Sequence, residues 1–174
     1  PYFQDDYDLF QKKINYDITK WYYDLNNFLS TIEKAYSSKV IIIPHPKVKN
    51  SFNPYYKKSF KVCSDLDAVH KLVPASKFVI SINGSTAIGL AIACQKPVVL
   101  IYNDQQKQKN QELFRDLKFI SKKCGSKLVN INNYQTKSIY NKVNKKIYKK
   151  YFNDYISTKN ISKKRNYEII NNLI

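Results

Sequence analysis

The chain has 174 residues, of which 43% are hydrophobic and 14% aromatic, and its formal net charge is +17. The apolar content excludes an intrinsically disordered chain, and the length fits one domain with a buried core. Lysine supplies nearly all the basic side chains, because Arg115 and Arg165 are the arginines. A specific nucleic-acid site more often carries clustered arginine and aromatic residues, so we expect no specific nucleic-acid partner. An anionic ligand or an anionic membrane face is compatible with the charge.

The three cysteines, Cys63, Cys94 and Cys124, show no CxxC spacing. We therefore expect buried free thiols in a reducing compartment. No apolar run reaches the ~18 residues of a membrane span, and no signal peptide is recognisable. These features predict a cytoplasmic location. The chain begins at Pro1 and contains no Met, which leads us to expect a fragment of a longer protein.

The first predicted elements are an acidic loop and a long helix. Asp5 and Asp6 lie in the loop, where paired carboxylates can do acid–base or metal chemistry; a solvated loop is the alternative. From Ile18 to Tyr36, apolar residues recur at helical spacing. This spacing predicts an amphipathic helix whose aromatic side chains belong to the core.

A fully apolar strand over 40–43 is predicted next, and the sequence Pro44-His45-Pro46-Lys47 follows it. His45 thus lies just past the carboxyl end of a buried strand, which is where ligands bind in open α/β sheets. An imidazole there can hydrogen-bond a phosphate, and Lys47 adds positive charge. The alternative is a loop histidine without a partner. A short edge strand and a helix follow, and we expect His70 in that helix to be structural or to face solvent.

Residues 78–102 predict a strand, a short helix and a second strand. Both strands are almost continuously apolar, which is typical of a βαβ unit in a parallel sheet covered on both faces. Gly84, Ser85 and Thr86 stand where the first strand ends and the helix begins. Free N–H groups and the positive end of the helix dipole favour a phosphate at such a point. The alternative is that Ser85 only caps the helix.

A helix over 105–123 and a strand over 127–131 complete the predicted domain. The alternation of strands and helices over 1–135 predicts an α/β, Rossmann-like domain with about five parallel strands and helices on both faces. We expect the strand through Val79 to lie in its interior, between the strands through Ile42 and Val99.

Residues 136–174 are predicted to form basic amphipathic helices. Val143, Ile147 and Phe152 lie on one apolar stripe, and we expect residues 136–156 to be helical. The lysines form either a solvated face or a peripheral contact with an anionic membrane surface, in which case the chain would lie against the inner membrane.

Two short motifs, each placed after a buried strand, resemble those of a known family. The first is IIIPHP (41–46), and the second lies within FVISINGSTAIGLAIACQKPVVLIY (78–102). Together they resemble the C-terminal half of GT-B type bacterial surface-polysaccharide glycosyltransferases. The resemblance is to sialyltransferases and Kdo transferases of capsule and lipooligosaccharide synthesis, which hold a CMP-sugar with a His-Pro motif and a Ser-Ser or Ser-Thr motif.

The resemblance covers residues 1–102 and implies a donor site that needs no metal. His45 would be catalytic, hydrogen-bonding or protonating the phosphate of the departing nucleotide. Asp5 and Asp6 match no motif of the family. In these enzymes an N-terminal half binds the glycan acceptor and supplies the catalytic base, so we expect this chain to be inactive without it. The implied nucleotide-binding residues are His45, Pro46, Lys47, Gly84, Ser85 and Thr86.

Three alternatives stay open. CDP-glycerol-dependent glycerophosphotransferases use a similar histidine and serine. Non-hydrolysing sugar-nucleotide epimerases share the GT-B architecture but need further carboxylates. The third alternative is a basic, non-enzymatic module that binds an anionic polymer.

Overall fold

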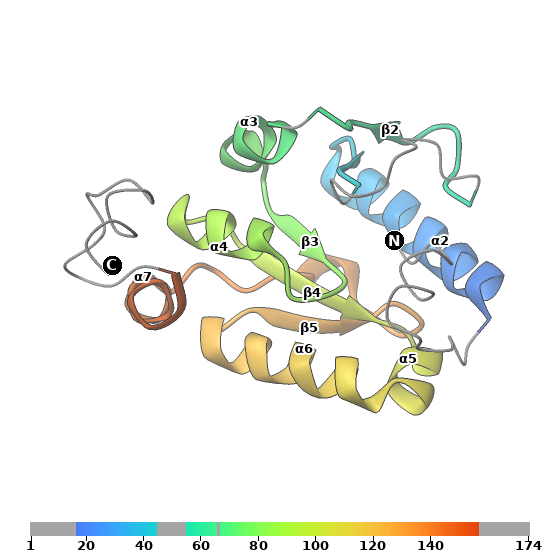
Figure 1. The fold of residues 1–174 in the computed structure, drawn as a ribbon. Helices are drawn as coiled ribbons and strands as arrows, with labels where there is room; N and C mark the ends of the chain where they lie inside the picture. Colours follow the sequence, from blue (N-terminus) through green and yellow to red (C-terminus); the bar gives the residue numbers. More distant parts are fainter. Residues whose placement is uncertain (1–16, 45–54, 66, 157–174) are drawn as a thin grey trace, which may run out of the picture.

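The computed structural model describes residues 17–44, 55–65 and 67–156 (Figure 1). Helices and strands alternate along this part of the chain. The helices are α2 (Ile18–Tyr36), α3 (Ala68–Ala75), α4 (Thr86–Ala93), α5 (Asp104–Lys109), α6 (Gln111–Cys124) and α7 (Lys145–Tyr151), with the shorter turns η1 (Thr136–Ser138) and η2 (Phe152–Ile156). The strands are β1 (Ile41–Ile42), β2 (Lys61–Val62), β3 (Val79–Ser81), β4 (Val98–Tyr102) and β5 (Lys127–Asn130). The predicted α/β class is therefore confirmed.

The strands form two open parallel sheets. One contains β1 and β2, with Ile42 opposite Val62. The other has the order β3-β4-β5, with Ile80 opposite Val99 and Leu100 opposite Leu128. The alternation along β4 divides the core, because Val99 and Ile101 face one cluster of apolar side chains, whereas Val98 and Leu100 face another.

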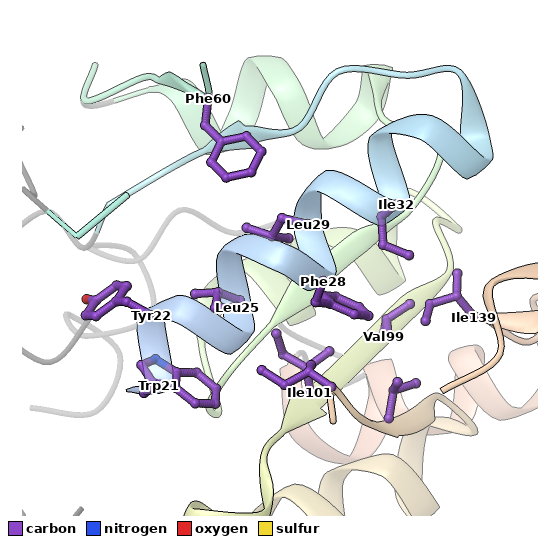
Figure 2. Close-up of a cluster of buried hydrophobic side chains, with 12 residues drawn as sticks. Trp21, Tyr22, Leu25, Phe28, Leu29, Ile32, Phe60, Val99, Ile101 and Ile139 are labelled. Carbon is purple, nitrogen blue, oxygen red and sulfur yellow. The ribbon is translucent and has the colours of Figure 1, made fainter. Parts of the chain in front are cut away.

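Helix α2 covers one face of the three-stranded sheet. Its buried side chains contact Val99 and Ile101, as Figure 2 shows. The helix begins at the N-cap Asp17, whose carboxylate accepts a hydrogen bond from Lys20 N, and it ends at Ser37 in the left-handed region (φ 44°). The spacing predicted from the sequence is thus confirmed, and the aromatics Trp21 and Phe28 are core residues.

Helices α4, α6 and α7 lie on the other face. Ile88 from α4, Leu117 from α6 and Tyr148 from α7 pack around Val98 and Leu100. The helices on opposite sides of β4 explain why four consecutive residues of this strand are fully buried. A strand shielded on both faces has no exposed side and therefore reads as a continuous apolar run.

The predicted single sheet of about five strands is wrong, because the structure has sheets of two and three strands. The expected interior position of Val79 is wrong as well: in the part of the chain described, β3 pairs with β4 alone. Apolar character reports that side chains are buried, whereas the order of strands depends on backbone pairing. Both β3 and β1 are partly exposed, and Ile41 is 37% exposed.

The segment 136–156 packs on the domain, but it is not one helix. A 3-10 turn is followed by irregular chain, and α7 begins only after Asn144, whose side chain accepts hydrogen bonds from Lys146 N and Ile147 N. The apolar stripe is nevertheless confirmed in part, because Val143 and Phe152 pack against the cluster around Leu100. Asn144 is an N-cap residue, and such a side chain starts a new helix rather than continuing one.

Candidate functional site

The loop between β3 and α4 is the part of the predicted nucleotide site that the structure describes. Gly84, Ser85 and Thr86 are all exposed there, directly after the carboxyl end of β3. Ser85 stands at the N-cap position of α4, in extended conformation (φ −131°, ψ 157°). The first amides of an α-helix have no acceptor within the helix, so this loop offers donors to an anion.

The Ser85 hydroxyl does not cap the helix. Its Oγ makes no hydrogen bond to a first-turn amide and instead lies 3.4 Å from the Oγ of Ser81. Ser81 in turn donates to the carbonyl oxygen of Asn83 at 2.8 Å, which fixes the turn that leaves β3. The contact with Ser81, rather than a helix cap, therefore holds the Ser85 hydroxyl in place.

The absence of a side chain at Gly84 allows α6 to pack closely against the loop. A Cβ built on Gly84 would lie 3.2 Å from Cδ1 of Ile120 on α6, so the helix packs closely against the loop. Beside this contact is an open depression of about 390 Å³, and its lining side chains are Asn83, Leu113, Asp116, Phe119 and Ile120. Its apolar walls and carboxylate do not suit a phosphate, so an anion would bind on the Ser85 and Thr86 side of the loop.

The other half of the predicted site, His45, Pro46 and Lys47, lies outside the described residues, as do Asp5 and Asp6. The first described range ends at Pro44, just after β1. We expected β1 and β3 to be neighbours in one sheet, but β1 pairs with β2 in a separate sheet. The side chains of Ile42 and Ile80 do pack against the same apolar cluster. The convergence of His45 and Ser85 stays a prediction.

Asn26 fixes the chain at Tyr55 and Lys57, where the described residues resume. This side chain of α2 is buried, donates to the carbonyl oxygen of Tyr55 at 2.7 Å and accepts from Lys57 N at 3.2 Å. One amide side chain thus satisfies two backbone groups, as a neighbouring strand would. Helix α2 therefore fixes the position of the backbone at residues 55–57.

At the carboxyl end of β4, polar side chains form hydrogen bonds with one another. Asn103 is fully buried, caps α5 by accepting from Gln106 N at 2.9 Å, and donates to the Asp24 carboxylate of α2 at 3.2 Å. Asp104 accepts from Asn130 Nδ2 at 2.7 Å, which links α5 to β5. The burial of Tyr102, together with the charge of Asp104, raises the pKa of this phenol. These hydrogen bonds connect α2 and β5 to the end of β4 and the start of α5.

Sequence reasoning missed the buried Asp24. The signal was present, because a carboxylate stands in the apolar stripe of α2, between Trp21 and Phe28. A charged group on a buried helix face requires partners. Lys20 Nζ of the same helix lies 3.5 Å from Asp24 Oδ1, and Asn103 donates to Asp24 Oδ2 across 79 residues. Only the packing of α2 on the sheet identifies the second of these partners.

The remaining titratable candidates are His70 and the three cysteines. His70 is exposed on α3, as expected from the sequence. Cys63, Cys94 and Cys124 are free thiols, but Cys124 alone of the three is fully buried. In the ranges described, no three His, Cys, Asp or Glu residues are grouped so as to hold a metal ion. Nor does any helix in those ranges have the length and apolarity needed to span a bilayer.

No protein-family model, curated protein or solved structure matches this chain. The glycosyltransferase resemblance therefore stays a hypothesis that depends on residues 45–47 and 84–86 and on the fold around them.

Proposed function

We propose that this chain is the donor-binding half of a glycosyltransferase that uses a nucleotide-activated sugar, with a CMP-sugar favoured, in bacterial capsule or lipooligosaccharide synthesis. The observation that carries the proposal is the uncapped Ser85 hydroxyl at the N-terminus of α4, exposed at the end of a parallel strand. Parallel strands followed by helix N-termini are the usual setting for nucleotide phosphates.

In this proposal the loop binds the donor phosphate. The hydroxyls of Ser85 and Thr86 and the first amides of α4 donate hydrogen bonds to its oxygens, with Gly84 allowing close approach. His45, with Pro46 and Lys47 beside it, stabilises or protonates the departing nucleotide without a metal ion. A second half of the enzyme binds the glycan acceptor and supplies the catalytic base.

Nucleotide titration tests the binding part of the proposal. Isothermal titration of the full chain with CMP, CDP and UDP should show tightest binding to a cytidine nucleotide. A charge-assisted hydrogen bond is worth about 1.5–3 kcal/mol, so Ser85→Ala should weaken binding by about tenfold or more. The matched control is Ser64→Ala, at an exposed serine between β2 and α3, which should leave binding unchanged. His45→Ala should weaken binding as Ser85→Ala does.

Three outcomes would redirect the assignment. Tighter binding of CDP-glycerol than of CMP-sugars would favour a glycerophosphotransferase, and epimerised sugar nucleotide would favour an epimerase. Unaltered nucleotide affinity in both Ser85→Ala and His45→Ala would contradict the proposed site. Binding of heparin in preference to every nucleotide would indicate a non-enzymatic anion-binding module.

A further inference from the structure

Exposed apolar side chains gather where η2 meets α6. Phe119 is 54% exposed, Tyr155 49% and Ile156 41%. The rings of Phe119 and Tyr155 meet edge to face, with centroids 6.5 Å apart. Ile156 lies over α4, because a Cβ on Gly89 would be 3.4 Å from its Cδ1. Phe119 and Tyr155 thus meet at the surface, and with Ile156, the next residue in the chain, they form a small exposed apolar patch. Contiguous patches of this kind mark surfaces that bind a partner or a membrane.

Basic side chains outnumber acidic ones around this patch, where Asp116 and Asp154 are the nearby carboxylates. Arg115, Lys122 and Lys123 stand three or four residues from Phe119 along α6 and therefore flank it. The ammonium of Lys123 lies 5.4 Å from the centre of the Phe119 ring. Over α6, α7 and η2 there are eight basic and three acidic side chains, a formal net charge of +5. We call Phe119, Tyr155 and Ile156, with Arg115, Lys122 and Lys123, the aromatic–lysine face.

The face lies on one side of the molecule. Tyr148 of α7 packs with Leu117 of α6 in the core cluster on one face of β4, whereas α2 packs on the opposite face. Figure 1 shows α6 below the sheet, α7 to its left and α2 at its upper right. Lysines on α2 therefore serve as controls that point away from the aromatic–lysine face.

We propose that the aromatic–lysine face binds the surface of an anionic membrane. Tyrosine and other aromatic rings favour the level of the lipid headgroups, and nearby lysines are attracted by anionic lipid. The kind of basic residue favours a membrane over other partners. Seven of the eight basic side chains are lysine. Lysine is depleted at protein–protein interfaces, and arginine is preferred for nucleic-acid recognition.

The face adjoins the β3–α4 loop, because Phe119 lines the same depression as Gly84. Membrane binding would thus hold this loop close to the lipid surface. The inference does not depend on the proposed activity, since it rests on other side chains. Ser85→Ala should accordingly leave membrane binding unchanged.

Vesicle flotation with the full chain tests the proposal. The protein should float with vesicles of equal parts phosphatidylglycerol and phosphatidylcholine, should not float with pure phosphatidylcholine, and should be released by high salt. The double variant Lys122→Glu and Lys123→Glu should weaken binding by about tenfold or more. The matched control, Lys34→Glu with Lys39→Glu, changes the charge equally at exposed positions in and after α2 and should have a much smaller effect.

A second pair tests the aromatic part. Phe119→Ser with Tyr155→Ser should also weaken flotation by about tenfold or more. Tyr23→Ser removes a ring that is 66% exposed on α2 and should leave flotation unchanged. Absence of flotation, equal binding to neutral vesicles, or equal loss in the control variants would overturn the proposal. So would a dimer in light scattering that Phe119→Ser dissociates, or single-stranded RNA binding that exceeds vesicle binding.

Discussion

Replacing Asn103 by Ala should separate α2 and α5 from the end of β4. The side chain caps α5 through Gln106 N at 2.9 Å, and loss of an N-cap costs about 0.5–2 kcal/mol. It also donates at 3.2 Å to the Asp24 carboxylate, and a hydrogen bond to a charged group is worth about 1.5–3 kcal/mol. Because Asn103 is fully buried, water replaces neither bond. We expect the free energy of unfolding to fall by about 2–5 kcal/mol.

Urea unfolding followed by tryptophan fluorescence measures this loss. Trp21 is the single tryptophan, is 1% exposed, and lies on α2 one turn from Asp24, so its emission reports the docking of that helix. The matched control is Asn110→Ala, because Asn110 also caps a helix, accepting from Leu113 N at 3.1 Å. This control should cost about 1 kcal/mol.

The difference between the two variants isolates the bond to Asp24. A double-mutant cycle with Asp24→Ala should give a coupling of about 1 kcal/mol or more. If Asn103→Ala destabilised the protein no more than Asn110→Ala does, the buried Asp24–Asn103 bond would not stabilise the fold, and the argument would be refuted.

Two further substitutions test the tail and the end of α6. Burial, with the nearby Cys124, raises the pKa of Tyr148 from the usual 10.0 to about 12, so the folded state keeps this proton to higher pH than the unfolded state. Stability should therefore fall from pH 10 to about 12, and the fall should be shallower in Tyr148→Phe; equal slopes in urea titrations would contradict this. Gly125→Ala should cost about 1–2 kcal/mol, because Gly125 has φ +64° and its Cβ would meet Ile147 at 3.3 Å. Gly89→Ala, inside α4, should be neutral or stabilising, and equal melting temperatures for the two alanine variants would refute the conformational argument.

Elements whose cause is local were predictable from the sequence. The apolar period of α2 and the apolar run of β4 can each be recognised from neighbouring residues along the chain. The helix break at Asn144 was missed, although an N-cap residue stood in the sequence, because a continuing apolar stripe outweighed it.

For the candidate site, too, the sequence predicted the local feature and missed the contact that depends on the folded turn. The place of Ser85 at the start of a helix was predicted, since strand, turn and helix follow one another directly. The hydrogen bond between the hydroxyls of Ser85 and Ser81 was not predicted, because it depends on the conformation of the chain between them. Residues 45–47 stay a sequence-based prediction.

The sequence by itself thus determined the α/β class, the long apolar face of α2 and the place of Ser85 at the start of α4. Only the tertiary structure decided which strands pair, which polar groups meet and which apolar side chains stay exposed. Asp24 and Asn103 are 79 residues apart, and Phe119 meets Tyr155 across α6 and η2. Such contacts depend on the packing of whole elements, and the chain's local pattern fixes each element without fixing its neighbour.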